Sequence, residues 1–134
     1  MARKLIDANV ILRYLLRDDE GLFQKAMETL EKVRTGEERV IILESVLTEC
    51  VYVVLKVYKV KRSLIAQKLG GLLYYKGVVN SDKQDLIDSI KLFGETRLSF
   101  VDCLLCIKSK NNDMPIVTFD EELRNISKKP VMAR

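Results

Sequence analysis

The chain of 134 residues contains no histidine. This absence excludes Ser-His-Asp and Cys-His catalytic units, zinc sites that need imidazole ligands, and any imidazole general base. Cysteine is scarce too: its three residues are too few for the disulfide framework of a small secreted protein. Any catalysis must therefore use carboxylates, amines, thiols, hydroxyls or a metal ion.

Long uninterrupted apolar runs are also missing. The longest nearly uncharged stretch, residues 40–55, contains Glu44 and Glu49 and is too short to cross a bilayer. The N-terminus lacks the apolar run that precedes the cleavage site of a signal peptide. We therefore expect no membrane association and a cytoplasmic protein whose cysteines stay reduced.

Length and patterning predict one domain over residues 1–134, since 48% of the residues are hydrophobic and can form a real core. Short apolar strands alternate with amphipathic helices, which is typical of an α/β fold with a mostly parallel sheet covered by helices on both sides. The expected strands are residues 3–7, 40–43, 78–79, 115–118 and 130–132. The expected helices are residues 10–15, 18–34, 45–59, 62–73, a helix starting in a capping box at 81–84, and 100–110.

Positive charge is concentrated in one segment. The whole chain carries a net charge of +4, but residues 51–81 hold six basic side chains and no acidic one. The same segment contains four of the five tyrosines, so cations that can neutralise phosphates lie near rings on which bases can stack. A solvated helix face with tyrosines in the core is the alternative interpretation. The candidate RNA-binding residues are Lys56, Lys59, Lys61 and Arg62.

Four acidic residues stand at unusual positions. Asp7 and Asp120 each follow an expected strand, at the end where open α/β sheets carry their functional crevice. Glu49 and Asp102 lie on expected helices beside apolar neighbours, where an uncompensated carboxylate is costly to desolvate. Helix capping is an alternative role for Asp7, Asp102 and Asp120, but it does not explain Glu49.

Acids that converge on one crevice would repel each other unless a cation joined them. Oxygen ligands without histidine or thiolate favour Mg²⁺ or Mn²⁺.

Two other motifs are weaker candidates. Cys103-x-x-Cys106 lies on an expected helix without further metal ligands, which indicates core packing. Gly70-Gly71 lacks the strand-loop-helix setting of a phosphate-binding loop.

Four segments taken in order resemble the PIN-domain ribonucleases, in particular the VapC-type toxins of toxin–antitoxin pairs. They are Leu5–Leu16, Val46–Leu55, Phe100–Leu105 and Val117–Asp120. The resemblance covers nearly the whole chain and departs at Ser99, where many relatives carry another acid. It implies a three-layer α/β/α sandwich with a central parallel sheet of about five strands. It also implies Mg²⁺- or Mn²⁺-dependent cleavage of RNA, a homodimer and a cognate antitoxin protein.

The resemblance also assigns residues to roles. We expect Asp7 and Asp102 to bind the metal, and Glu49 and Asp120 to bind a second ion or orient water. The small polar positions of the family fall here on Asn9 and Thr118, which would steady these ligands by hydrogen bonds. The ion would lower the pKa of a bound water, and the resulting hydroxide would attack phosphorus.

Three alternatives remain open. An aspartyl phosphatase of the haloacid-dehalogenase kind also begins with an acid after its first strand, but that class needs Asp-x-Asp, and Asn9 occupies the second place. A PIN nuclease can process RNA without any antitoxin. A PIN module can also bind RNA or regulate without catalysing its cleavage.

Overall fold

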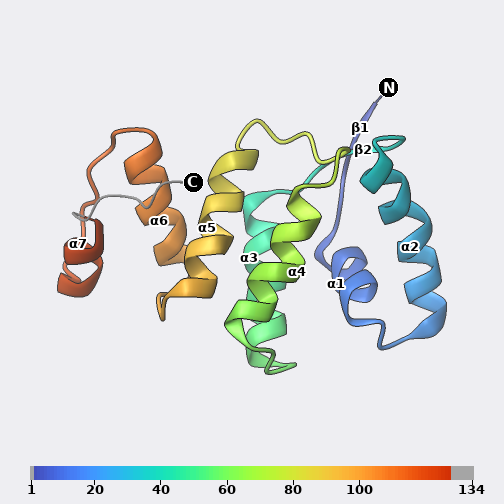
Figure 1. The fold of residues 1–134 in the computed structure, drawn as a ribbon, viewed down its shortest axis with the longest axis horizontal. Helices are drawn as coiled ribbons and strands as arrows, with labels where there is room; N and C mark the ends of the chain where they lie inside the picture. Colours follow the sequence, from blue (N-terminus) through green and yellow to red (C-terminus); the bar gives the residue numbers. More distant parts are fainter. Residues whose placement is uncertain (1, 128–134) are drawn as a thin grey trace.

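The computed structural model describes residues 2–127 and shows an α/β arrangement (Figure 1). The described part of the chain contains two strands and seven helices. In chain order these are β1 (Arg3–Leu5), α1 (Ala8–Leu16), α2 (Glu20–Thr35), β2 (Arg39–Ile41), α3 (Glu44–Lys56), α4 (Arg62–Leu73), α5 (Lys83–Glu95), α6 (Phe100–Asn111) and α7 (Glu121–Ser127).

The sheet is small and parallel. β1 pairs with β2 in a register that places Lys4 opposite Val40 and Leu5 opposite Ile41. A parallel pair needs a crossover, which α1 and α2 supply here. On its other edge β2 meets a single parallel bridge between Val40 and Val78. The expected strand at residues 78–79 is thus reduced to one bridge.

Residues at the two ends of α2 explain where this helix begins and ends, whereas α5 begins without a capping side chain. The Asp19 carboxylate accepts a hydrogen bond from the Leu22 N–H at 3.0 Å and starts α2. Gly36 ends α2 in the left-handed region, with φ 85°, where glycine is favoured. α5 begins with Asp82 as its N-cap, but no side-chain cap bond forms there. The capping box expected at residues 81–84 is therefore absent.

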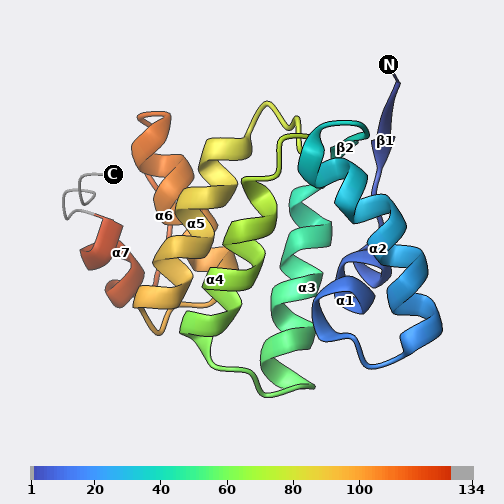
Figure 2. The same ribbon diagram turned by 45° about the vertical axis from the view of Figure 1, so that its right-hand side comes forward.

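The helices follow one another along the longest axis of the molecule (Figures 1 and 2). α1 packs on α2 and α3, α4 on α5, and α5 on α6, while α7 packs on α6. β1 and α2 lie at one end of the long axis and α7 at the other in both views. The core runs through the helical layers and includes the fully buried side chains of Ile11, Leu30, Ile42, Leu47, Leu73, Leu86 and Phe93.

The structure differs from the sequence-based expectation at residues 115–118, which form no strand. This segment leads from α6 into α7, and α7 is held against α6 by its buried Leu123. The Arg124 guanidinium donates to the Thr118 carbonyl oxygen at 2.7 Å, which fixes the direction of the segment. The chain therefore does not run beside β1. The expected strand at residues 130–132 lies outside the described residues.

Candidate active site

The first candidate acid lies directly after β1. Asp7 is the N-cap residue of α1, and its carbonyl oxygen accepts from the Val10 and Ile11 N–H groups at 3.2 and 3.4 Å. Its side chain makes no capping hydrogen bond and is exposed. Asn9 lies in the first turn of the same helix and is exposed too. The carboxylate of Asp7 is therefore available at the carboxyl end of β1.

The second acid, Glu49, reaches the same region from α3. Its neighbour Cys50 is buried, and the thiol contacts the Ala8 carbonyl oxygen at 3.8 Å, which ties α3 to the start of α1. Burial, with smaller contributions from the charges of Glu49 and Asp7, raises the pKa of the Cys50 thiol to about 12. The two residues of this contact adjoin Glu49 and Asp7 in the chain. The packing of α1 on α3 places these two chain segments against each other.

The third acid, Asp102, occupies the first turn of α6. The Ser99 hydroxyl oxygen accepts from the Asp102 N–H at 3.1 Å, so the backbone of Asp102 takes part in the helix cap. Its half-buried side chain lies near Cys103 and Cys106, whose pKa values are raised first by burial and also by the charge of Asp102. An ion pair at 3.0 Å between Lys108 and Glu44 links α6 to α3.

The fourth acid, Asp120, forms a hydrogen bond within its own segment of the chain. Its carboxylate accepts from the Leu123 N–H at 3.1 Å and caps α7. The Thr118 hydroxyl oxygen accepts from the Asp120 N–H at 3.0 Å. Both residues thus belong to the turn that starts α7, and the carboxylate of Asp120 is itself the helix cap.

Within residues 2–127 no three acids or cysteines come together in a way that could hold a metal ion. Asp7 precedes α1 and Glu49 lies on α3, which packs against α1, whereas Asp120 belongs to the segment at the α7 end of the molecule (Figure 1). The four acids predicted from the sequence therefore do not form one complete metal site within residues 2–127.

The basic segment separates into exposed and internal side chains. Lys56, Lys59 and Lys61 are exposed. The Arg62 guanidinium instead donates to the carbonyl oxygens of Phe93, at 3.1 Å, and of Leu98. It also lies 3.7 Å from the centroid of the Phe93 ring, and burial lowers its pKa. Arg62 thus holds α4 against α5 and the loop before α6, and we leave it out of the RNA-binding surface.

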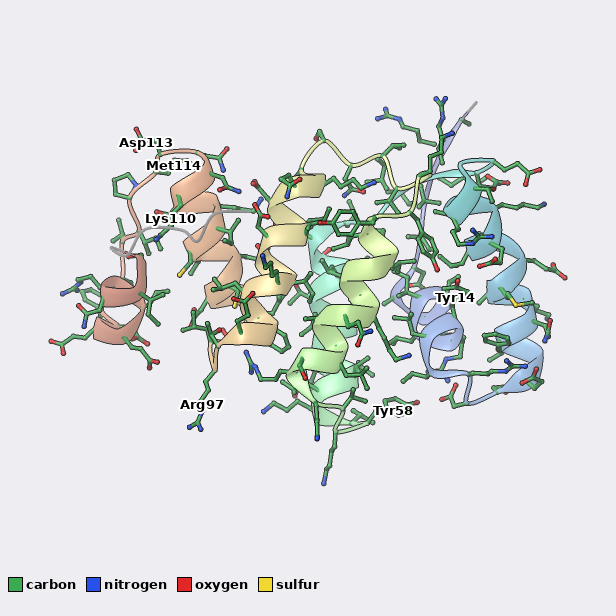
Figure 3. All side chains as sticks on the ribbon, viewed as in Figure 1. Tyr14, Tyr58, Arg97, Lys110, Asp113 and Met114 are labelled. Carbon is green, nitrogen blue, oxygen red and sulfur yellow. The ribbon has the colours of Figure 1, made fainter. Side chains whose placement is uncertain are left out.

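The tyrosines of this segment also take different roles. Tyr52 and Tyr74 are 62% and 68% exposed. The Tyr58 hydroxyl donates to the Asp18 carboxylate at 2.7 Å, near the turn between α3 and α4 (Figure 3). Tyr75 shares a hydrogen bond of 2.7 Å with Tyr14. Only Tyr52 and Tyr74 therefore offer largely open rings among these four.

Helical spacing groups three candidate side chains on one exposed face of α3. Glu49, Tyr52 and Lys56 are separated by three and four residues and are all exposed. We name this set the α3 face. The spacing of these three residues in the sequence already indicates that they share one face of a helix. Considering the acidic and the basic residues separately does not reveal this shared face.

A shallow hollow of about 450 Å³ lies elsewhere, between α4 and α5. Gly70, Gly94 and Tyr74 are among the residues that line it. None of the candidate acids lines it. The hollow is therefore separate from the candidate active site.

The family model of the PIN domain matches residues 4–129, and the chain belongs to the PIN domain family. The chain is also similar to a protein named VapC ribonuclease from Aquifex aeolicus (strain VF5). The two are 26% identical over 129 residues, which cover 96% of this chain and 95% of that protein. No solved structure matches the chain. No helix among residues 2–127 has the length and apolarity needed to span a membrane.

Proposed function

We propose that this protein is an endoribonuclease that hydrolyses RNA phosphodiester bonds and depends on Mg²⁺ or Mn²⁺. The observation that carries the proposal is the position of Asp7 directly after a parallel strand, together with the contact of 3.8 Å between Cys50, which follows Glu49 in the chain, and the carbonyl oxygen of Ala8, which follows Asp7. Open α/β sheets bind their ligands at this end. Membership in the PIN domain family and the likeness to a protein named VapC ribonuclease support the proposal and favour it over an aspartyl phosphatase.

The carboxylate oxygens of the candidate acids are suitable ligands for the proposed ion. Their positions within residues 2–127 are too far apart for them to bind one ion together. Carboxylate oxygens without imidazole are the ligands that Mg²⁺ and Mn²⁺ prefer. However, no three of the candidate acids lie together in residues 2–127. The proposed ligands Asp7 and Asp102, with Glu49 and Asp120 in supporting roles, therefore require a rearrangement or a second chain. The proposed sheet of about five strands also requires a rearrangement or a second chain, because residues 115–118 need another strand with which to pair.

The α3 face provides a surface on which RNA could lie next to the acids. The ring of Tyr52 can stack on a base, and the ammonium group of Lys56 can contact a phosphate. Lys59 and Lys61 extend the positive charge beyond the end of α3. Phosphates would be held by the cations while the bond to be cleaved reaches the acidic end of β1.

Replacement of single acids tests the proposed activity. We expect Asp7→Asn and Glu49→Gln to lower cleavage of a labelled RNA in Mg²⁺ or Mn²⁺ by about 100-fold or more, since each would remove a charge from the site. Glu28→Gln, an exposed change on α2, is the matched control. Unchanged cleavage by Asp7→Asn would contradict the proposal.

We further propose that the protein is the toxin of a toxin–antitoxin pair, acting in the cytoplasm on cellular RNA. Expression should arrest growth, and a small protein encoded beside it should restore growth. Growth arrest that no neighbouring gene product relieves would instead indicate a PIN nuclease without an antitoxin.

A second candidate function is RNA binding without cleavage. The observation that favours it is the separation of the acids in the described protomer. Retained RNA binding, with no cleavage by the wild-type protein in any divalent metal, would decide for this candidate.

A further inference from the structure

β1 and β2 carry two arginines directly beside each other. Their parallel register pairs Arg3 with Arg39, and both residues are exposed (Figure 1). Neighbouring strands lie about 4.8 Å apart, and residues in register carry their side chains on the same face of a sheet. Two guanidinium groups therefore extend from one face at the amino end of the sheet, which is the end remote from Asp7.

The charges of these arginines are not neutralised within the described part of the chain. Neither guanidinium group makes a hydrogen bond or an ion pair in residues 2–127. Glu38 precedes Arg39, but its carboxylate is paired with Lys4 at 3.1 Å. Because side chains alternate along a strand, Lys4 lies on the opposite face from Arg3. Like charges in neighbouring positions of a sheet destabilise it, so this pair has a cost that an external anion would remove.

Protection of an open strand edge does not explain both arginines. Charged side chains on an edge strand commonly prevent pairing with other chains, and Arg3 on β1 could serve this purpose. β2, however, is flanked on one side by β1 and on the other by the bridge between Val40 and Val78. Arg39 therefore does not lie on an edge strand, and its exposed charge needs another explanation.

Lys76 adds positive charge at the same end of the sheet. The Gly77 carbonyl oxygen accepts from the Val40 N–H at 2.8 Å, so Lys76 precedes a residue that is bonded to β2. Its side chain lies against Gly36, where an added Cβ would come within 2.9 Å of the Lys76 Cδ atom. Lys76 belongs to the basic segment of residues 51–81, whereas the two arginines do not. Tertiary structure therefore joins cations that are separate in the sequence.

β1 leads from the arginine pair to the first candidate acid. Beyond Leu5, the Ile6 N–H donates to the Ile41 carbonyl oxygen at 3.4 Å, and Asp7 keeps an extended backbone with φ −84° and ψ 151°. At about 3.3 Å per residue, Arg3 and Asp7 lie about 13 Å apart along this segment. Leu5, which lies between them, is 72% exposed. A nucleic-acid strand held at the arginines can therefore follow β1 toward Asp7.

We propose that Arg3 and Arg39 together bind one phosphate group of RNA at the amino end of the sheet. The inference rests on the proposed function for the identity of the ligand. Two guanidinium groups suit a phosphate because each can donate paired hydrogen bonds to its oxygens and always remains charged. Phosphate contacts carry no sequence information, so the site positions the RNA strand without selecting its bases. The phosphate is either an internal diester or the monoester at the 5′ end.

RNA binding without metal tests the site independently of cleavage. Fluorescence anisotropy of a single-stranded RNA, labelled at its 3′ end and held in EDTA, measures the affinity. We expect Arg3→Gln and Arg39→Gln each to weaken binding by about tenfold at low salt. Lys4→Gln is the matched control, because it removes the same charge from the opposite face of β1. Equal affinity of Arg3→Gln and the wild type, or equal losses in all three variants, would overturn the site.

The salt dependence shows whether the two arginines share one phosphate. Each single variant and the double variant should lower the slope of log affinity against log salt by about 0.7, which is the value for one phosphate of a single strand. A double variant that lowers the slope by about 1.4 would indicate two separate contacts and contradict the shared site. Arg3→Lys with Arg39→Lys should keep the wild-type slope but recover only part of the affinity, since an ammonium group lacks the planar fork.

Two RNAs that differ only at the 5′ end identify the source of the phosphate. Tighter binding of the RNA with a 5′-phosphate than of the RNA with a 5′-hydroxyl, lost in Arg3→Gln, would assign the terminal monoester. Equal binding of both RNAs, with the same loss in Arg3→Gln, would assign an internal diester. Either result supports the site, whereas an affinity that Arg3→Gln leaves unchanged for both RNAs would overturn it.

Cleavage assays separate this inference from the proposed activity. In Mg²⁺ or Mn²⁺ the double glutamine variant should raise KM for RNA by the same factor by which it weakens binding. A wild-type protein that does not cleave RNA, but binds it through the two arginines, would overturn the proposed activity alone. A wild-type protein that cleaves RNA, with a double variant that binds and cleaves it equally well, would overturn the phosphate site alone.

Discussion

The side chain of Asn80 hydrogen-bonds both backbone polar groups of Ile42. Its carbonyl oxygen accepts from the Ile42 N–H at 2.9 Å, and its amide nitrogen donates to the Ile42 carbonyl oxygen at 2.6 Å. Asn80 is buried and follows the bridge residue Val78. Beyond the single bridge at Val78, the Asn80 side chain thus makes the hydrogen bonds to Ile42 that the backbone of a longer strand would make.

This relationship predicts a large cost for Asn80→Ala. The change leaves two buried backbone groups without partners, so we expect the free energy of unfolding to fall by about 2–3 kcal/mol. Urea unfolding followed by circular dichroism measures the loss. Ser81→Ala, at the exposed neighbouring position, should change stability by less than about 0.5 kcal/mol. Equal stability of the two variants would show that the Asn80 contacts contribute nothing.

Two glycines predict opposite effects of the same substitution. At Gly77 an added Cβ would lie 2.0 Å from the Glu38 carbonyl oxygen and 2.6 Å from that of Val33, so the backbone must move. We expect Gly77→Ala to destabilise the protein by about 1–3 kcal/mol or more. At Gly71, inside α4, an added Cβ meets nothing within 4 Å, and Ala should stabilise the helix by about 0.5–1 kcal/mol. Thermal unfolding of both variants should give melting temperatures on opposite sides of the wild type.

The buried thiols predict slow chemical modification and a loss of stability in alkali. Burial raises the pKa of Cys50 to about 12 and that of Cys103 to about 11. Unfolding returns them to values near 9, where they lose protons more easily. The unfolded state is therefore favoured increasingly as pH rises above about 9. Iodoacetamide at pH 8 should label the cysteines in urea but leave the native protein nearly unlabelled. Rapid native labelling would contradict their burial.

The exposed lysines predict a salt-dependent effect on RNA affinity. Lys56→Ala and Lys59→Ala should weaken RNA binding and lower the slope of log affinity against log salt by about one per lost phosphate contact. Fluorescence anisotropy in an Asp7→Asn background measures binding without cleavage. Lys32→Ala, exposed on α2, is the matched control. An equal effect of all three changes would indicate general charge attraction instead of a defined RNA path.

Replacement of Arg62 should lower the stability of the protein, whereas replacement of the exposed lysines should lower its affinity for RNA. Arg62→Ala removes contacts to two carbonyl oxygens and to the Phe93 ring, and we expect it to cost about 2 kcal/mol in urea unfolding. Arg62→Lys should recover only part of this, because an ammonium group cannot reproduce the planar fork. Lys61→Ala is the control, as Lys61 is exposed. A stable Arg62→Ala protein with weak RNA binding would return Arg62 to the RNA-binding surface.

Local pattern was enough to predict α1 to α6 and the chemistry of the donors, whereas α7 was not among the expected helices. Apolar spacing placed α4 at Arg62–Leu73 as observed, and Gly36 marked the end of α2 because it can adopt a positive φ. The absence of histidine left carboxylates as the ligands to consider, and the spacing of the acids carried the likeness to the PIN domain family.

Tertiary structure decided the features that depend on partners distant in the sequence. A strand requires a second strand, so the apolar run at residues 115–118 could not determine by itself whether it would pair. The packing of α7 on α6 directs this run away from β1 of its own chain. Likewise, the sequence identifies Arg62 as a cation, but only the position of Phe93 makes it an internal link. Side-chain periodicity fixes local conformation, whereas contacts between distant elements decide which acids share a site.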